Sequence, residues 1–362
     1  MLLPNKTKWV MVMYKAYRFR LYPNEEQRIF INKTFGCQRF VYNYYLSIIK
    51  DNGYKNVYSN INDYVNNLKY EYVFLGEVDS TSIRKTLFHL DTNFKRHYNN
   101  GFGYPKYKSK YAKNSYMTSA IYRKYKDKEC CNIEVNLKNR TIKLPKLKEV
   151  EIRGYRNLDK INGSIINATI SREATGKYYV SVMCEIPEVK QIIPSTIVGI
   201  DLGIKKHLTL SDTTTYDNNK YIEKYEKRIK RIQRELSRKE KGSNNYYKCK
   251  KKLNILYTKL KNARKYNLHH ITKEITDATL FEILRQLKYK AKEKGKHFYQ
   301  VDTYFPSSQL CSVCNNKDTK YKNLNERNYY CTHCHNHLDR DLNAIINVMF
   351  EELRLYMNEV YA

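Results

Sequence analysis

The sequence has no apolar run long enough to cross a bilayer, and its start, "MLLPNKTKWVMVMY", is too short and too interrupted for a signal peptide. Its nine cysteines are not spread as a disulfide framework, because four of them form two close pairs near the end. That arrangement is typical of a reducing compartment and of a metal site. No repeat of the solenoid type occurs. We therefore expect a cytoplasmic protein without a membrane partner.

Acidic residues are scarce: 36 Asp and Glu stand against 67 Lys and Arg, which gives a formal net charge of +31. A surplus of this size favours a polyanionic partner, most often nucleic acid. The chain is also rich in Tyr, Asn, Lys and Ile, a profile typical of an A/T-biased genome. Such a bias raises Glu together with Lys, so it does not account for the one-sided charge. The composition therefore predicts a nucleic-acid-binding protein.

Hydrophobic periodicity predicts a small β domain with a helical insertion in the first half of the chain. Residues 14–22 alternate as a strand does, and Asn24 and Gln27 then stand at capping-box spacing, so a helix starts there. A further helix is expected over 80–98. From about residue 115 the period changes to two, which predicts β-hairpins over 133–144 and 165–186.

The second half begins with a proline-containing linker at 187–196, followed by a short hairpin around Asp201. Residues 221–270 carry apolar side chains at steps of three and four, on both sides of "KGSNN", which predicts an αα-hairpin. This stretch holds 17 Lys or Arg and 4 Glu. A charged helical face is often only solvated, but a surplus this one-sided favours an anionic partner. An amphipathic helix ending at Gly295 and a strand over 296–305 are expected next.

The strongest motif is a pair of CxxC sequences separated by sixteen residues, formed by Cys311, Cys314, Cys331 and Cys334. Four thiolates at this spacing can close a tetrahedron around Zn²⁺ while the intervening loop folds back as a hairpin. His333 and His335 lie within and beside the second pair and are alternative ligands, although four cysteines already complete the shell. A closed tetrahedron has no open position for a substrate, so we expect zinc as a structural cofactor.

Two aspartates are candidate ligands for a divalent cation. Asp201 follows a β-branched run, and Asp341 lies with Asp339 at the start of the helix predicted for "DRDLNAIINVMF". Carboxylates at a helix start are favoured by the exposed amides and the helix dipole, so one of the latter two can be simply a cap. Metal-dependent phosphodiester chemistry needs several carboxylates around one or two cations, so further acids are required.

Five segments occur in the order in which they occur in a known family: "YRFRLYPNEEQ", "RFVYNYYL", "VGIDLGIKKHLTL", "RQLKYKAKEKGKHFYQVDTYFPSSQLCSVC" and "DRDLNAIINV". From about Tyr14 onward the chain resembles the TnpB proteins encoded by bacterial insertion sequences, which are similar to the ancestors of type V CRISPR effectors. The resemblance implies an α+β multidomain fold. It has a wedge-type β-barrel with an inserted helical recognition lobe, then an RNase-H-like (RuvC) α/β domain with a basic αα-hairpin and an inserted four-cysteine zinc ribbon.

Carried onto this sequence, the resemblance predicts the following bounds: a leader at 1–13, the wedge at 14–22 and 99–190, the helical recognition lobe at 23–98, the RuvC domain at 195–305 and 338–362 with its hairpin at 221–270, and the zinc ribbon at 306–337. Family members bind an RNA made from the transposon end and recognise a short motif beside the DNA target. They then open the duplex by RNA–DNA pairing.

The family's RuvC site cuts DNA with two divalent ions held by an Asp, a Glu and an Asp. The first and the last match Asp201 and Asp341, but the strand that should end in the Glu is missing, because "NARKYNLHHITKEITDATLFEILRQL" runs from helix to helix. Glu274 is the nearest acid and a weak substitute, whereas Glu282 suits the polar face of the following helix. Two remnant aspartates would hold one Mg²⁺ weakly at most.

We therefore predict RNA-guided, sequence-specific binding of double-stranded DNA by a protein whose RuvC site is inactive, which makes it not an enzyme. Such a protein is expected to repress transcription in the bacterial nucleoid, in competition with RNA polymerase at promoters. Two alternatives stay open. One is an active transposon-encoded RNA-guided DNA endonuclease in which Glu274 or another acid replaces the missing Glu. The other is a decayed transposase remnant.

Two groups of residues are predicted to contact nucleic acid. The resemblance assigns the reading of the short duplex motif to Tyr58, Ser80, Thr81 and Arg84, of which Tyr58 is equally well explained by packing. The backbone of the guide RNA or of the heteroduplex is expected to bind to cations of the αα-hairpin: Lys227, Arg228, Lys230, Arg231, Arg234, Arg238, Lys250 and Lys251.

Overall fold

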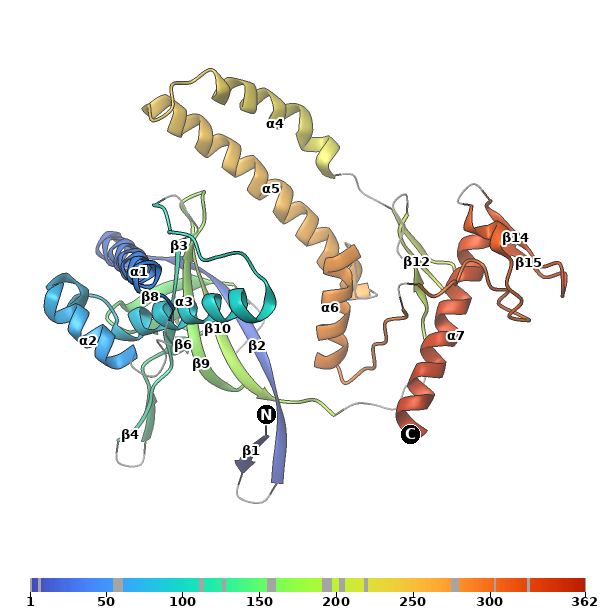
Figure 1. The fold of residues 1–362 in the computed structure, drawn as a ribbon, viewed down its shortest axis with the longest axis horizontal. Coiled ribbons are helices and arrows are strands. Elements are labelled where there is room, and N and C mark those ends of the chain that lie inside the picture. Colours follow the sequence, from blue (N-terminus) through green and yellow to red (C-terminus); the bar gives the residue numbers. More distant parts are fainter. Residues whose placement is uncertain are drawn as a thin grey trace. The chain divides into compact units, whose positions relative to one another are not determined.

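The computed structural model describes residues 2–5, 8–54, 61–110, 114–125, 128–154, 161–190, 197–201, 206–217, 221–274, 280–302, 304–323 and 326–361. For residues 2–5, 8–11, 124–125, 128–129, 201, 206–208, 217, 221–222, 267–274, 280–285 and 360–361 it describes the backbone alone. The chain divides into two compact units, Met1–Glu188 and Val189–Ala362. Each unit contains both helices and strands, so the chain is a mixed α/β protein (Figure 1).

The first unit is built around an antiparallel sheet of eight strands in the order β3-β9-β10-β2-β8-β7-β6, with β1 paired to β2 (Figure 1). The strands are β1 (Leu2–Asn5), β2 (Lys8–Tyr22), β3 (Asn114–Ser119), β6 (Glu134–Asn136), β7 (Thr141–Leu144), β8 (Lys148–Arg153), β9 (Ser164–Arg172) and β10 (Tyr178–Pro187). Because β3 and β6 each pair on one side only, the described strands form an open, curled sheet. They do not close into the predicted barrel.

The long strand β2 shows how the sheet buries one face. Tyr17, Phe19 and Leu21 are at most 3% exposed, and Arg18 and Arg20 alternate with them on the opposite face. Both predicted hairpins are confirmed as β6–β7 and β9–β10. The structure adds a hairpin that was not predicted, formed by β4 (Tyr122–Tyr125) and β5 (Lys128–Cys131).

Between β2 and β3 the described residues form three helices and a 3₁₀ turn: α1 (Glu25–Asn52), α2 (Ile61–Glu71), η2 (Val73–Gly76) and α3 (Ser80–Asn100). The predicted capping box opens α1, because the side chain of Asn24 accepts from the amide of Gln27 at 2.8 Å and the side chain of Gln27 accepts from the amide of Asn24 at 3.0 Å. These elements share a core of their own that includes Val41, Leu46, Leu87 and Phe94.

Asp79 joins α3 to the sheet. Its carboxylate accepts hydrogen bonds from the amides of Thr81 and Ser82 at 3.2 and 3.1 Å, so it caps α3. The same carboxylate accepts a hydrogen bond from the hydroxyl of Thr118 on β3 at 2.8 Å. One buried carboxylate therefore accepts hydrogen bonds from the first amides of a helix and from a hydroxyl on a strand.

The second unit consists of small sheets and long helices. Its elements are β11 (Ile200–Asp201), β12 (Lys206–Leu210), β13 (Thr215–Asp217), α4 (Tyr221–Ser237), α5 (Asn244–Glu274), α6 (Leu280–Glu293), η3 (Thr319–Lys322), β14 (Asn328–Tyr330), β15 (His337–Asp339) and α7 (Arg340–Tyr361). β11, β12 and β13 form a three-stranded antiparallel sheet, and β14 pairs with β15.

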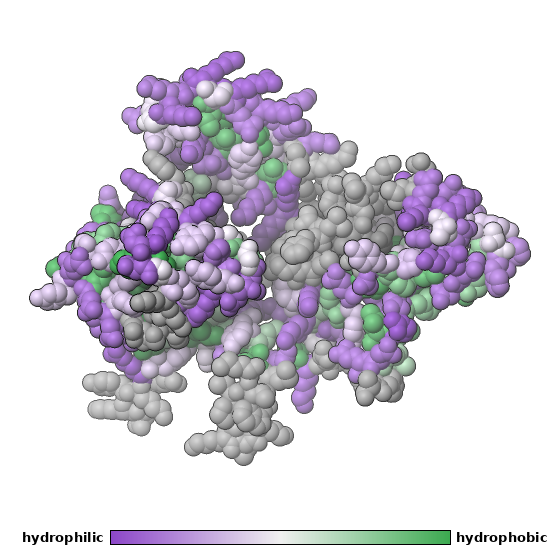
Figure 2. All heavy atoms as spheres, in the orientation of Figure 1, coloured by the Kyte–Doolittle hydropathy of each residue, from purple (hydrophilic) through white to green (hydrophobic). Residues whose placement is uncertain are grey.

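Helices α4 and α5 confirm the predicted αα-hairpin. Its core lies where the apolar periodicity predicted it, at Ile229, Ile232, Cys249, Leu253, Leu256 and Leu260. Figure 2 shows mostly hydrophilic side chains on the visible face of this hairpin, with hydrophobic residues between its two helices. The hairpin is therefore a thin two-helix structure with a charged exterior.

The prediction of a strand over 296–305 is wrong, since none of the described residues in that range forms a strand. The segment packs its aromatic side chains against α7 instead. The ring centroids of His297 and Tyr299 lie 5.0 and 6.2 Å from that of Tyr356, and the hydroxyl of Tyr299 is hydrogen-bonded to Glu359. Aromatic residues that alternate along the chain thus cover a helix here. The period-two pattern alone does not distinguish this arrangement from a strand.

Across the part of the chain that the structure describes, no helix combines the length and the apolar character needed to span a membrane.

Replacing Asp79 with Ala should lower the free energy of unfolding by about 1–3 kcal/mol, because α3 loses its cap and the Thr118 hydroxyl loses its acceptor. The control is Glu77→Ala, which removes an acid whose ion pair with Lys33 is exposed and should cost less than about 1 kcal/mol. Urea unfolding, with hydrogen exchange to locate the change at the start of α3, measures both. Equal unfolding midpoints for the two variants would contradict this role of Asp79.

Candidate metal centre, carboxylate site and nucleic-acid interface

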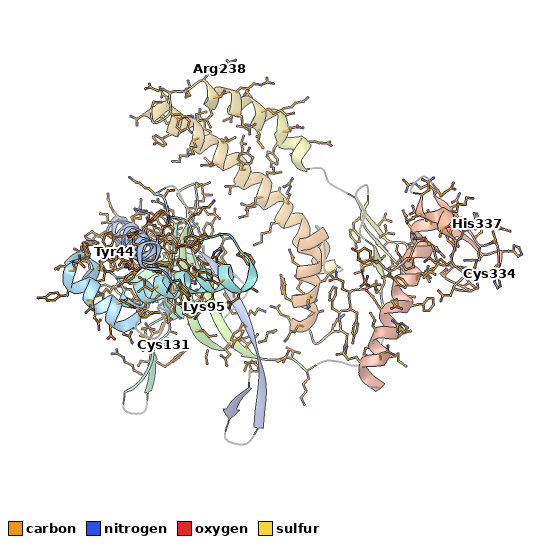
Figure 3. The ribbon with its side chains drawn as sticks, in the orientation of Figure 1. Tyr44, Lys95, Cys131, Arg238, Cys334 and His337 are labelled. Carbon is orange, nitrogen blue, oxygen red and sulfur yellow. The ribbon has the colours of Figure 1, made fainter. Side chains whose placement is uncertain are left out.

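Four cysteines converge in the second unit. The Sγ atoms of Cys311 and Cys334 are 3.5 Å apart, as are those of Cys314 and Cys331, and all four lie within 4.8 Å of one another. Thiolates about 2.3 Å from a tetrahedral Zn²⁺ are about 3.8 Å apart, whereas disulfide sulfurs are about 2.05 Å apart. The cluster, near the labelled Cys334 in Figure 3, therefore could hold a metal such as zinc and contains no disulfide.

The two CxxC turns share one backbone conformation and one hydrogen-bond pattern. The residue after each pair, Asn315 or His335, has a left-handed φ of 60° or 59°. Its amide donates to the carbonyl of the first cysteine of its pair, Cys311 or Cys331, at 2.9 Å in both turns. Hydrogen bonds from backbone amides, led by that of Cys334, lower the pKa of Cys331 to about 6, so its thiolate is available at neutral pH.

Neither candidate histidine belongs to this cluster. The Nδ1 atom of His335 lies 2.9 Å from the hydroxyl of Tyr330, and the side chain of His333 is exposed. Among the described residues, the four cysteines form the one group of three or more side chains that could hold a metal ion. The structure therefore favours the four-cysteine set over the histidine alternatives.

The start of α7 separates the roles of its two aspartates. The Oδ1 atom of Asp339 accepts from the amides of Asp341 and Leu342 at 2.9 and 3.1 Å, which makes Asp339 the cap. Asp341 lies in the first turn of α7, and its side chain is exposed. Asp339 therefore caps α7, and the Asp341 carboxylate stays available as a ligand.

Two asparagines of α7 hold the segment before the first cysteine pair. The Nδ2 atom of Asn343 donates to the carbonyl of Leu310 at 2.6 Å, and its Oδ1 accepts from the amide of Ser312 at 2.9 Å. The Nδ2 atom of Asn347 donates to the carbonyls of Ser307 and Leu310 at 2.8 and 2.7 Å. Both asparagines are buried, so these bonds fasten the four-cysteine segment to the helix that carries Asp341. Sequence reasoning missed them, although both lie in "DRDLNAIINV".

Strand β11 lies against α7. A Cβ atom placed on Gly199 would be 2.8 Å from the carbonyl oxygen of Ile345 and 3.0 Å from the Cβ of Met349, so a glycine is needed for this approach. Asp201 follows two residues later, and its side chain lies outside the described residues. Asp341 lies one helical turn before Ile345. The strand and the helix that carry the two predicted acids therefore pack against each other.

Glu274 is the last residue of α5 and Glu282 lies in the first turn of α6. The side chains of both glutamates lie outside the described residues.

The residues predicted to read a duplex motif fall into two groups. Tyr58 lies outside the described residues, whereas Ser80, Thr81 and Arg84 occupy the first turns of α3. The ammonium of Lys69 donates to the hydroxyl of Ser80, and its pKa is lowered by burial and by the nearby charges of Lys146 and Arg84.

Lys146 also donates to the carbonyls of Gly76 and Val78, at 2.6 and 3.1 Å. Three cations therefore gather beside α3: Lys69, Arg84 and Lys146. Sequence reasoning missed Lys69 and Lys146, because only the tertiary fold brings them to this helix.

The cations predicted to bind a nucleic-acid backbone lie along α4 and at the start of α5, with Arg238 at the turn between them (Figure 3). Lys230 and Arg231 form ion pairs with Glu226 and Glu235 at 2.6 and 3.8 Å. The others are partly or fully exposed: Lys227, Arg228, Arg234, Arg238, Lys250 and Lys251.

Three family models match the chain in sequence order. A "Helix-turn-helix domain" model of the IS605 OrfB type matches residues 11–56, the IS605 OrfB "Probable transposase" model matches 181–293, and the "Cas12f1-like, TNB domain" model matches 281–348. Together these matches cover more than half of the chain, and the last contains all four clustered cysteines.

Curated relatives match over nearly the whole length. A Streptomyces pristinaespiralis protein named "Putative RNA-guided DNA endonuclease" is 29% identical, with 92% of this chain and 88% of the relative covered. The Escherichia coli K12 protein "Putative RNA-guided DNA endonuclease InsQ" is 26% identical, with 94% and 92% covered.

Among solved structures, a Cas12f1–sgRNA–target DNA complex is similar at a TM-score of 0.33 and 15% identity, with 94% of this chain and 100% of that chain covered. A CRISPR–Cas12f ternary complex is similar at a TM-score of 0.34 and 16% identity, with 90% and 82% covered. Both TM-scores are low, and the likeness carries no argument about function.

The comparisons correct one prediction from the sequence. The expectation that the chain is not an enzyme is wrong, because the relatives that match it end to end are named as endonucleases. No comparison supports a repressor, and the prediction built on the missing Glu strand is overturned with it. The predicted family, by contrast, is confirmed by the domain models and by the curated relatives alike. The chain belongs to the TnpB family, the OrfB proteins of IS605-type insertion sequences.

Proposed function

We propose that this protein is an RNA-guided DNA endonuclease whose cleavage site lies where β11 meets α7. The observation that carries the proposal is the contact of Gly199 with Ile345 and Met349, which brings the strand of Asp201 against the helix of Asp341. The names of the end-to-end relatives supply the reaction class. The exposed Asp341 carboxylate, which the cap at Asp339 leaves unused, supports its role as a ligand.

Glu274 is the proposed third acid. It ends α5, the helix after which the sequence shows no apolar run like the family's glutamate-bearing strand, and it is the acid nearest to that position in the sequence. Carboxylate oxygens are the ligands that Mg²⁺ prefers, and bound Mg²⁺ would supply a nucleophile and stabilise the leaving oxygen at phosphorus. The side chains themselves would hold and orient the cations and so position the scissile phosphate.

Guide RNA and a DNA duplex with a short adjacent motif are the proposed partners. The exposed cations of α4 and α5 suit the backbone of RNA or of the RNA–DNA heteroduplex, which is bound through charge and not through sequence. Ser80, Thr81 and Arg84, with Lys69 and Lys146 beside them, are proposed to contact the adjacent motif, Arg84 by base reading or by phosphate contact. Tyr58 is proposed to act with them.

We also propose the domain assignment that the sequence predicted. The first unit would be a wedge with its helical recognition lobe, and the second a RuvC domain with an inserted zinc ribbon. The division after Glu188 and the open eight-stranded sheet support the first part. The three-stranded sheet beside α7 and the paired cysteine turns support the second. Zinc would be structural, and its ribbon would hold α7 through Asn343 and Asn347.

Endonuclease activity is tested with the protein and the RNA that copurifies with it. The variable end of this RNA identifies the target sequence. In Mg²⁺ the complex should cut a matching duplex placed beside randomised flanking sequence. Asp201→Asn, Asp341→Asn and Glu274→Gln should each lower the cleavage rate about a thousandfold or more, with DNA binding retained.

The control is Glu282→Gln, which should leave the rate within about twofold. A protein that binds the matched duplex and leaves it intact with every divalent cation would refute the endonuclease. Full activity of Glu274→Gln beside an inactive Asp201→Asn would refute the choice of Glu274 alone.

The backbone-binding role of the αα-hairpin is tested by the salt dependence of heteroduplex binding. Changing Lys227, Arg234 and Arg238 to Gln should reduce the slope of log K against log salt by about 2–3, since each lost phosphate contact accounts for roughly 0.9. Arg234→Lys with Arg238→Lys keeps the charges and should keep the slope. A slope that is the same in the Gln variant and in the unaltered protein would show that these cations face solvent only.

Metal analysis of the purified protein should find about one zinc per chain, and Cys331→Ser should reduce that content to below about a tenth and lower cleavage as well. His335→Asn should retain zinc, because Asn315 adopts the same left-handed conformation in the first turn and His335 faces Tyr330. Loss of zinc from His335→Asn would make this histidine a ligand and contradict the four-cysteine set.

A further inference from the structure

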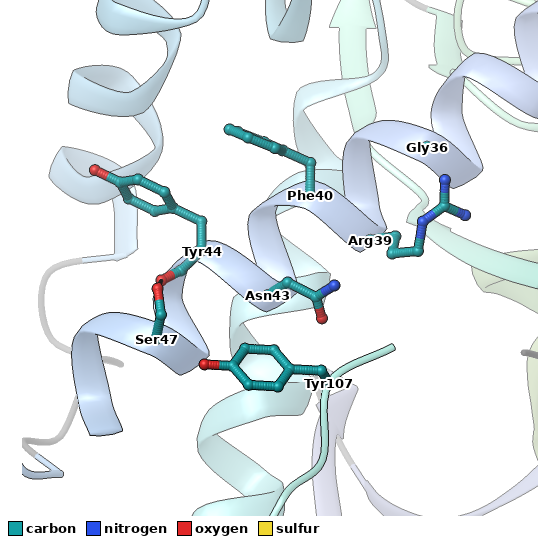
Figure 4. A pocket seen from close by; sticks show the side chains of 7 residues that line it. All are labelled: Gly36, Arg39, Phe40, Asn43, Tyr44, Ser47 and Tyr107. Carbon is teal, nitrogen blue, oxygen red and sulfur yellow. Dashed lines mark hydrogen bonds between the residues drawn. The ribbon is translucent and has the colours of Figure 1, made fainter. Parts of the chain in front are cut away.

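A hollow of about 490 Å³ lies along one face of α1, and Tyr107 closes it from the neighbouring loop (Figure 4). Its other lining residues recur at helical spacing: Gly36, Arg39, Phe40, Asn43, Tyr44 and Ser47. This volume falls within the range of pockets that hold one small ligand. We refer to it as the α1 hollow.

The aromatic walls of the α1 hollow are held in place. The rings of Phe40 and Tyr44 are stacked at 5.9 Å between centroids, and the Phe40 ring also packs edge-on against Tyr72 and Phe74, at 4.8 and 5.5 Å between centroids. The side chain of Asn43 bonds to both backbone groups of Lys108, at 2.8 and 3.0 Å, and so fixes the loop that carries Tyr107. Walls ordered in advance reduce the entropy that a ligand loses on binding.

The α1 hollow also carries positive charge. The guanidinium of Arg39 forms no hydrogen bond or ion pair within the part of the chain that is described. The ammonium of Lys50 lies 4.3 Å from the centroid of the Tyr107 ring, and that of Lys108 lies 3.8 Å from the Tyr42 centroid. An arginine without a partner among the described residues, beside one exposed ring (Tyr107) and two half-buried rings (Phe40 and Tyr44), is a combination that suits a phosphate next to a stacked base.

The floor of the α1 hollow is bare backbone at Gly36, in the middle of a 28-residue helix. Glycine destabilises a helix interior relative to alanine, and here no packing demands it, because a Cβ atom at this position would meet nothing within 4 Å. The open space that the glycine leaves is the space of the hollow itself. A flat ligand can therefore lie directly on the helix.

We infer that the α1 hollow binds one unpaired nucleotide of single-stranded nucleic acid, with its base stacked on the aromatic walls and its phosphate on Arg39. The inference rests on the nucleic-acid binding proposed above and is independent of cleavage. The ligand can come from RNA or from DNA, because both supply a base and a phosphate.

Recognition in the α1 hollow is tolerant of sequence. Both polar atoms of the Asn43 side chain are used by Lys108, and the hydroxyl of Ser47 donates to the carbonyl of Tyr44 at 2.7 Å. These groups are not available to read the edge of a base, so ring faces and one cation carry the binding. Every base has a face to stack, and we expect affinities for the four bases within about tenfold of one another.

The test is photocrosslinking of the full-length, zinc-loaded protein to short single strands that carry 5-iodouracil, in an RNA arm and a DNA arm, with a DNA duplex as comparison. Mass spectrometry should locate crosslinks at Phe40, Tyr44 or Tyr107. Tyr107→Leu removes a ring and Gly36→Leu fills the floor, and each should lower the crosslink yield at these residues about tenfold.

Two matched variants keep the test specific. Tyr107→Phe retains the ring, and Gly103→Leu adds the same side chain at an open glycine outside the lining, so both should crosslink as the unaltered protein does. A signal in the RNA arm, the DNA arm or both supports the inference and identifies the source.

Crosslinks confined to other residues, equal yield from the duplex, or equal loss in Tyr107→Leu and Tyr107→Phe would overturn it. A protein that crosslinks at the α1 hollow without cutting DNA would refute the endonuclease and leave this inference standing. A protein that cuts DNA without these crosslinks would refute this inference and leave the endonuclease standing.

Discussion

Helix α7 is the element to which the rest of the second unit is fastened. Three contacts converge on it: β11 approaches through Gly199, Asn343 and Asn347 bind the segment before the cysteines, and β15 continues directly into its capped first turn. Buried amide–carbonyl hydrogen bonds are costly to leave unmade, so these contacts are expected to persist or fail together. The metal centre and the candidate carboxylate site therefore depend on one helix, although they share no ligand.

The positive charge of the chain is arranged in three physically different ways. On α4 and α5 it consists of exposed point charges on a thin helical hairpin, which suits a long polyanion without sequence preference. Beside α3 it forms a cluster of three cations, in which burial, and then the charges of Lys146 and Arg84, lower the pKa of Lys69. In the α1 hollow a single guanidinium accompanies aromatic rings, which suits one nucleotide.

Local patterns predicted those elements whose side chains meet their neighbours within a few residues. The capping box at Asn24, the β9–β10 hairpin and the αα-hairpin were all expected, because caps, turns and apolar stripes are properties of short segments. The strand at 296–305 failed for the opposite reason. An alternating pattern states which side chains share a face, but a strand also needs a neighbouring strand, and here the neighbour is α7.

By itself the sequence determined the family and placed four cysteines at metal-binding spacing, because both are carried by residue identity and spacing in short motifs. The roles of Asp201 and Asp341 as cation ligands stay predictions. Only the tertiary structure decided that Asp339 caps α7 and leaves Asp341 exposed, that Asn343 and Asn347 join the helix to the cysteine segment, and that the sheet of the first unit stays open. Asp339 and Asp341 are both suited by sequence to cap α7, and only the backbone geometry distinguishes them. Burial, strand order and hydrogen bonds between distant segments are relations between groups that only the folded chain brings to within hydrogen-bond distance.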